Sequence, residues 1–261
     1  MNSDDLRYFG KYIVPIYIKE NGVLKHEGTG FLVNTGENDY LVSAAHIFRQ
    51  CSEKEMLFIT GNGKGCLIEF NAMIYNSDTD GDTYDIGVMA LLTHKPPYEA
   101  VEKEAINAQY LMPNFSLKLK KEFSIIGFPA TKSFSSNIKK NVSVKLYGYA
   151  AQSCQESEYT GVGITSEHHF ALFFDRKRCM DADGLKKEFP KPYGMSGSPI
   201  IYFPKRKSGA EKPQPFIVGV ATTYKEKEKL IYGADISIAL HFMKEIDDEI
   251  RAKKALNKAN H

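Results

Sequence analysis

Short apolar runs of three to nine residues recur along most of the chain, and many are bounded by Gly, Asn, Asp or Pro. Most are rich in Val, Ile, Tyr and Phe, which is typical of β-strands. Long helical segments do not alternate with them, which argues against a doubly wound α/β fold. We therefore predict an all-β barrel or sandwich, with strands at residues 13–18, 30–33, 40–44, 56–59, 67–75, 86–91, 124–126, 142–150, 170–174, 200–203, 216–221 and 230–237.

Turn residues separate several of these runs. Asn21-Gly22, Gly61-Asn62-Gly63 and Asp80-Gly81-Asp82 supply residues that tolerate a positive φ. The stretch at 152–193 is the least regular part of the sequence. We expect turns at the three stretches named first and an irregular segment at 152–193.

The C-terminal residues follow a different period. Apolar residues recur there at helical spacing, with charged residues between them: Ile238, Phe242, Met243, Ile246 and Ile250. This pattern predicts an amphipathic helix that packs one face on the body. We expect the Lys-rich tail at 251–261 to fray into solvent.

Length and charge exclude several classes of protein. A chain of 261 residues forms one large or two small domains. Its 34 basic and 32 acidic residues give a net charge of +2, so we expect no nucleic-acid partner.

No apolar stretch approaches the ~18 residues that a membrane span needs, and the first residues lack a leader-like run. The four cysteines lie far apart with no Cys-x-x-Cys pair. These features predict no membrane partner and a cytoplasmic location with reduced thiols.

Three local patterns follow one another along the chain. They are a hairpin from Gly28 that ends in Ser43-Ala44-Ala45-His46, then Asp85-Ile86-Gly87-Val88, then Gly194-Met195-Ser196-Gly197-Ser198-Pro199. Each pattern alone is common in structural positions. Together they supply every group that serine-dependent acyl transfer requires, because that chemistry needs a nucleophile, a base, a buried acid and amide donors.

The roles follow from those requirements. Ser196 is the candidate nucleophile, His46 the candidate general base, and Asp85 the partner that orients His46. Gly194 has no side chain to obstruct a substrate carbonyl, so the amides of Gly194 and Ser196 are the candidate oxyanion hole.

On these motifs the chain resembles the trypsin-like (chymotrypsin-fold) serine endopeptidases, and among them the bacterial, disulfide-independent HtrA-like branch. Two weaker matches, Ile125-Ile126-Gly127-Phe128-Pro129 and Ile217-Val218-Gly219-Val220-Ala221-Thr222, extend the resemblance over residues 10–245. The resemblance implies two perpendicular six-stranded β-barrels with the active site between them. We expect an N-terminal barrel at 1–120 with His46 and Asp85, a C-terminal barrel at 121–236 with Ser196, and a helix and tail at 237–261.

The resemblance also locates the substrate. The base of the primary pocket corresponds to Pro190, and Thr222, Thr223 and Tyr224 correspond to the strand that holds an extended peptide. No carboxylate stands at position 190, so we expect an apolar or small substrate side chain there rather than Arg or Lys. Because the sequence stops at His261, we expect no PDZ domain of the kind that HtrA-type enzymes carry.

Partners and alternatives complete the prediction. We expect a protein or peptide substrate, no cofactor and no metal, and an enzyme that is either constitutively formed or switched by a regulatory protein partner. A non-catalytic peptide-binding module on the same fold is the alternative. An α/β-hydrolase is disfavoured because its acid and histidine follow the serine. A zinc site at His168-His169 and a phosphate loop at Gly61-Asn62-Gly63-Lys64-Gly65 lack the required spacing.

Overall fold

The computed structural model describes residues 3–51, 54–59, 65–76, 84–92, 102–116, 118–130, 134–136, 141–143, 145–180, 186–204 and 214–259. The expected turns at 61–63 and 80–82, the phosphate-loop segment at 61–64 and the last two residues of the tail lie outside these ranges.

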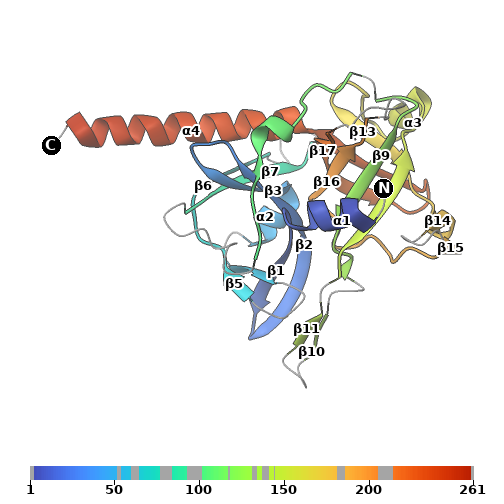
Figure 1. Ribbon diagram of the computed structural model, residues 1–261, viewed down its shortest axis with the longest axis horizontal. Coiled ribbons are helices and arrows are strands. Elements are labelled where there is room, and N and C mark those ends of the chain that lie inside the picture. The colour runs from blue at the N-terminus through green and yellow to red at the C-terminus, as the bar shows by residue number, and fades with distance from the viewer. Residues whose placement is uncertain are drawn as a thin grey trace.

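Two antiparallel sheets form the body of the protein (Figure 1). The first has the order β5-β4-β1-β2-β3-β7-β6, with β8 added in parallel to β2. Its strands are β1 Ile13–Glu20, β2 Val23–Asn34, β3 Asp39–Ala44, β4 Glu55–Ile59, β5 Gly65–Leu67, β6 Phe70–Tyr75, β7 Ile86–Leu91 and β8 Ile106–Asn107.

The second sheet has the order β12-β9-β16-β17-β18-β13. Its strands are β9 Glu122–Gly127, β12 Tyr147–Gln152, β13 His169–Phe173, β16 Ser198–Tyr202, β17 Phe216–Lys225 and β18 Leu230–Asp235. Two small hairpins, β10 Phe134–Ser136 with β11 Asn141–Ser143 and β14 Cys179–Met180 with β15 Lys186–Lys187, lie outside it.

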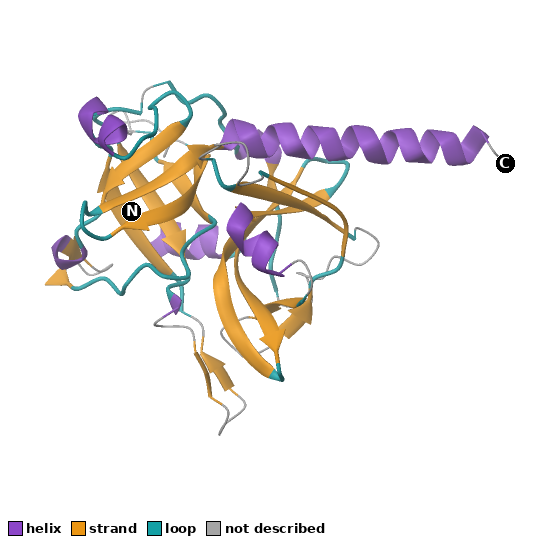
Figure 2. Ribbon diagram, turned by 180° about the vertical axis from the view of Figure 1, so that it is seen from behind, coloured by secondary structure: helices purple, strands orange, loops and turns teal. Residues whose placement is uncertain are grey.

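The two curled sheets confirm the predicted all-β, chymotrypsin-like double barrel. The second sheet has the six strands expected, and the described part of the first has eight, because β5 and β8 add to it. Helices and helical turns are few: α1 Ser3–Gly10, α2 Ala45–Cys51, η3 Ala108–Tyr110, α3 Glu156–Gly161, η5 Arg176–Arg178 and α4 Ile236–Ala259. Figure 2 shows how small the helical share of the body is apart from α4. The 152–193 stretch is more regular than expected, since it contains α3 and β13.

Three apolar cores explain the unbroken apolar strands. In β3, Leu41 faces the interior of the first barrel, while Tyr40 and Val42 face a shared core that also contains residues of β9, β17 and α4. A third core around Phe123 fills the second barrel. A strand buried on both faces is mostly apolar. β3 is buried throughout, and its two polar residues, Asp39 and Ser43, are hydrogen-bonded to Asn34 and to the Thr29 carbonyl. The shared core makes the two barrels and the helix one packed body.

Helix α4 extends well beyond the two sheets (Figure 1). It begins directly after Asp235, whose carboxylate accepts the backbone N–H of Ser237 at 3.0 Å. Asp247 anchors it to the first barrel, accepting hydrogen bonds of 2.5 Å from the Asn38 amide and from the Tyr40 hydroxyl. The expectation of a frayed tail from residue 251 is wrong, because the helix continues to Ala259. None of the helices in the described part of the chain is long and apolar enough to cross a membrane.

Candidate active site

The pairing of β3 with β7 brings His46 beside Asp85. Ala44, the last residue of β3, is opposite Ile86, the first residue of β7. The chain turns from Ala44 into α2, and the Ala45 N–H donates to the Asp85 carbonyl oxygen at 2.9 Å. Two residues far apart in the sequence therefore lie together at one end of the first barrel.

The carboxylate of Asp85 holds His46 by two hydrogen bonds. Oδ2 lies 2.6 Å from the ring Nδ1, and Oδ1 accepts the backbone N–H of His46 at 2.9 Å. Because a carboxylate accepts, Nδ1 carries the proton, and Nε2 of the neutral ring has its lone pair available. Asp85 has a φ of +51°, a left-handed conformation that is uncommon without glycine. The carboxylate thus fixes both the tautomer and the orientation of the imidazole.

Ser196 lies in a loop that the first barrel holds against the second. Its carbonyl oxygen accepts the N–H of Thr29 on β2 at 2.9 Å, and the next amide, Gly197 N–H, donates to the Ala221 carbonyl at 2.7 Å. Gly197 has a φ of +87°, and a Cβ there would come within 2.0 Å of the Thr29 carbonyl oxygen. Only glycine allows the chain to pass this close to β2.

The amides of Gly194 and Ser196 both point away from the protein groups around them. The Tyr193 carbonyl accepts from Ala130 N–H at 2.6 Å, so across the planar peptide the Gly194 N–H points the opposite way. The Met195 carbonyl accepts from Ser198 N–H at 3.0 Å, which orients the Ser196 N–H in the same manner. Within the described residues no backbone carbonyl accepts from either amide. Both donors are available to a ligand.

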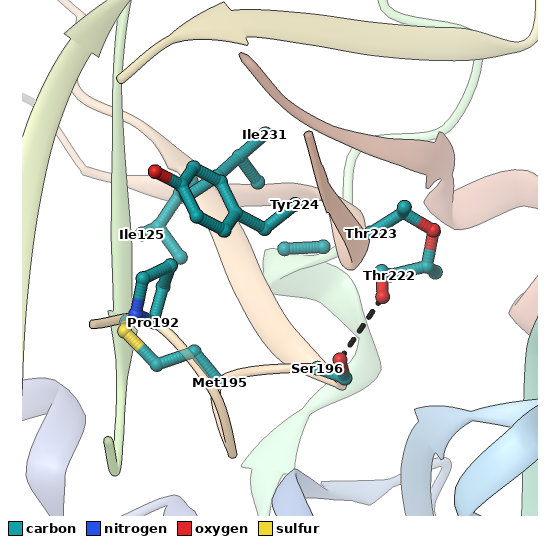
Figure 3. A pocket seen from close by; sticks show the side chains of 9 residues that line it. Ile125, Pro192, Met195, Ser196, Thr222, Thr223, Tyr224 and Ile231 are labelled. Carbon is teal, nitrogen blue, oxygen red and sulfur yellow. Dashed lines mark hydrogen bonds between the residues drawn. The ribbon is translucent and has the colours of Figure 1, made fainter. Parts of the chain in front are cut away.

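One cleft of about 360 Å³ brings these groups together. His46 and Ser196 both line it, with Gly194, Thr222 and Tyr224. The hydroxyl of Ser196 donates to the Thr222 carbonyl oxygen at 3.0 Å (Figure 3), so its proton is directed toward β17. The structure therefore brings His46 and Ser196 to one cleft, and Asp85 joins them through its hydrogen bond to His46.

A smaller pocket of about 20 Å³ opens beside Ser196. Its walls are mostly apolar and include Met195, Ile125 and Ile231. The ring of Tyr224 lies across it, between Ile231 and Pro192 (Figure 3), and packs edge-on against Phe174 with the ring centroids 5.4 Å apart. Pro190, expected at the base of this pocket, is buried, but among the described residues Pro192 lines the pocket and Pro190 does not.

The end of β17 offers a strand edge. Pairing of β17 with β16 ends at Ala221, whereas pairing with β18 continues to Lys225. Along Thr222, Thr223 and Tyr224 the edge that faces Ser196 therefore pairs with no other strand in the described part of the chain. An extended peptide adds to such an edge through backbone hydrogen bonds.

The sequence alone did not indicate Glu27 and Gln50, which also line the cleft. Gln50 is four residues after His46 on α2, so it would have been found if that helix had been predicted. Glu27 precedes the Gly28 motif, but its ion pair with Lys25 at 2.6 Å has no signal in the sequence. Across the described residues, no group of three or more His, Cys, Asp or Glu side chains is arranged to hold a metal ion.

Two curled sheets, with a hydrogen-bonded His and Asp from one and a glycine-flanked serine from the other, define the class of chymotrypsin-like double-barrel proteins. The family model for trypsin matches residues 4–234, so the chain belongs to the trypsin family, a family of serine peptidases. No curated protein matches the sequence significantly.

Proposed function

We propose that this protein is a serine endopeptidase that cleaves peptide bonds through an acyl-enzyme on Ser196. The observation that carries the proposal is the cleft that His46 and Ser196 share. Asp85 holds His46 there, and the N–H groups of Gly194 and Ser196 donate to no backbone carbonyl among the described residues. Ser196, His46 and Asp85 take the roles of nucleophile, base and orienting acid.

Catalysis begins when the Ser196 hydroxyl rotates about its Cα–Cβ bond from Thr222 toward His46. Oγ attacks the substrate carbonyl carbon while Nε2 of His46 takes the hydroxyl proton. The amides of Gly194 and Ser196 donate to the oxyanion. Collapse breaks the C–N bond, and His46 gives its proton to the leaving amine. Water then attacks the acyl-enzyme while His46 takes its proton, and the bond to Ser196 Oγ breaks to release the carboxylic acid product as His46 returns the proton to Oγ.

The substrate binds as an added strand. Its backbone pairs with the open edge at Thr222, Thr223 and Tyr224. The residue before the cleaved bond enters the 20 Å³ apolar pocket, which Tyr224 closes to large side chains. We therefore propose a preference for a small, uncharged residue at that position.

A non-catalytic peptide-binding module remains the second candidate, and one observation favours it. The Ser196 hydroxyl donates to Thr222 and not to His46. A module of this kind would keep the strand edge and the pocket but never direct Oγ toward the imidazole.

Labelling with a fluorophosphonate separates the two functions. An activated serine displaces fluoride from phosphorus, so intact-mass analysis should show one adduct, located on Ser196 by peptide mapping. The Ser196→Ala variant should take up none. Ser198→Ala is the matched control, since that hydroxyl is buried and makes no hydrogen bond within the described residues. Absence of label on the wild-type protein, under conditions that label an active serine peptidase, would favour the binding module.

A cytoplasmic location and membership of the disulfide-independent, HtrA-like branch are also proposals. Free thiols at Cys66 and Cys154 support both. Burial raises the pKa of Cys154 to about 11, which keeps this thiol protonated and unreactive.

A further inference from the structure

Arg49 contacts the carboxylate that orients His46. It follows His46 by three residues on α2, so both side chains lie on one face of the helix. Its Nη2 lies 3.3 Å from Oδ1 of Asp85, the oxygen that also accepts the His46 backbone N–H. The side chain of Arg49 is one quarter exposed, so water screens this pair only in part.

The guanidinium is anchored on its other side. Nη1 of Arg49 donates to the Asn76 carbonyl oxygen at 2.6 Å. Asn76 directly follows β6 and is tied to β7, because its N–H donates to the Ile86 carbonyl at 3.2 Å and its side chain accepts the Ile86 N–H at 3.3 Å. The planar fork of an arginine spans two acceptors in this way, whereas a lysine ammonium acts as a point charge.

Asp85 needs such support because of its backbone. A residue with a φ of +51° occupies a sparsely populated region and keeps it only where its surroundings over-determine it. The hydrogen bonds from α2 fix the carbonyl and the carboxylate of Asp85 from one side. The Arg49 guanidinium, anchored on the Asn76 carbonyl, binds the same carboxylate and stabilises it as the anion.

We propose that Arg49 is a positioning residue of the active site, which holds the Asp85 carboxylate in the orientation that keeps Nδ1 of His46 protonated. Arg49 acts on the reaction only through Asp85 and His46. The inference rests on the proposed peptidase function for its kinetic consequence, but its structural part concerns the His46 to Asp85 bond and needs no catalysis.

The test compares Arg49→Ala, Arg49→Lys and Arg251→Ala. The third variant is a matched control that removes an arginine ion-paired with Glu37 and Asp248, away from the cleft. For each variant, kcat and KM are measured on a peptide substrate, together with Tm and the low-field ¹H NMR resonance of the His46 Nδ1 proton.

Arg49→Ala should lower kcat by about 10- to 100-fold, by analogy with the loss of an outer partner of a metal-bound histidine, and leave KM within about twofold. The low-field resonance should broaden or shift. Arg49→Lys should recover only part of kcat and of the resonance, because the positive charge beside Asp85 returns but a single ammonium does not span both Asp85 and the Asn76 carbonyl. Arg251→Ala should match the wild type.

Two results would overturn the proposal. One is an Arg49→Ala protein with wild-type kcat and an unchanged resonance. The other is a lower kcat accompanied by a lower Tm, with the resonance unchanged. That result would mean that Arg49 stabilises the fold and does not position Asp85. If the wild type shows the resonance but no turnover, the peptidase function fails and the positioning role is still decided by the NMR comparison.

Discussion

Asp85 binds His46 twice, once through the ring and once through the backbone. The ring Nδ1 lies 2.6 Å from Oδ2, and the backbone N–H donates to Oδ1 at 2.9 Å. The same carboxylate thus orients the imidazole and caps the first turn of α2. Removing its charge while keeping its shape should therefore separate catalysis from folding.

Asp85→Asn should fold and lose activity. An amide NH₂ in place of Oδ2 cannot accept from Nδ1–H, so the ring adopts the other tautomer and Nε2 no longer accepts the serine proton. We expect kcat to fall by roughly ten-thousand-fold, as in other serine triads. Steady-state kinetics and a thermal melt check this. Asp248→Asn, on the exposed face of α4, is the control and should keep full activity. Equal kcat values for the two variants would remove Asp85 from the mechanism.

Tyr224→Gly should change the primary specificity. Loss of the ring joins the 20 Å³ pocket to the cleft and makes room for a large apolar side chain. Burial of such a side chain contributes about 1.5 to 3 kcal/mol, so kcat/KM for a substrate with Phe or Leu before the cleaved bond should rise by about 10- to 100-fold relative to one with Ala.

A peptide-library cleavage profile measures this shift. Phe173→Ala, which truncates an exposed aromatic residue on β13, should leave the profile unchanged. If wild-type enzyme already prefers Phe or Leu, then Tyr224 does not close the pocket.

Gly194→Ala should damage the oxyanion site. Gly194 has a φ of +85°, and a Cβ there would lie 2.7 Å from Cε1 of His26 and 2.9 Å from the Ala130 nitrogen. The peptide must shift, so the Gly194 amide moves. Loss of one oxyanion donor typically lowers kcat by about 100- to 1000-fold.

Gly36→Ala is the matched control for this substitution. Gly36 has a similar φ of +90°, but a Cβ there meets no atom within 4 Å. Its cost is backbone strain alone, so it should lower the denaturant midpoint and keep kcat. If Gly194→Ala keeps wild-type kcat as Gly36→Ala does, the Gly194 amide is not an oxyanion donor.

The strands and the triad could be predicted from the sequence because their signals are local. Residues 86–91 form an unbroken apolar run, and β7 is buried at each of these positions. The three motifs place His46, Asp85 and Ser196 next to strand ends. The sheets then bring His46 and Ser196 to one cleft, with Asp85 bonded to His46.

Helix α2 could not be predicted, because nothing next to it in the sequence caps it. The residues before it, Ser43 and Ala44, belong to β3, and the caps come from Asp85 on another strand. Arg49 was missed for the same reason. The length of α4 was underestimated because the regular apolar spacing ends at Ile250 and the described side chains after it are exposed, although the helix continues to Ala259.

The last prediction concerns acid stability and His26, whose ring lies under Gly194. Its Nε2–H donates to the Gly28 carbonyl at 2.8 Å, its Nδ1 is buried, and the residue as a whole is partly buried. Burial lowers the pKa of His26 from 6.5 to about 4, against the opposing effect of the Gly28 bond. Between these two pH values His26 is therefore protonated in the unfolded chain and neutral in the folded protein.

Stability should fall as the pH drops from about 6.5 to about 4, because the unfolded state takes up more protons in that window. The difference in pKa corresponds to roughly 3 kcal/mol of unfolding free energy. His26→Gln keeps a donor for Gly28 and does not titrate, so its unfolding free energy should depend less on pH. Urea unfolding at pH 7, 6, 5 and 4.5 checks this against His241→Gln, an exposed histidine on α4. If the unfolding free energies of His26→Gln and the wild type depend on pH in the same way, the pKa of His26 is not lowered in the folded protein.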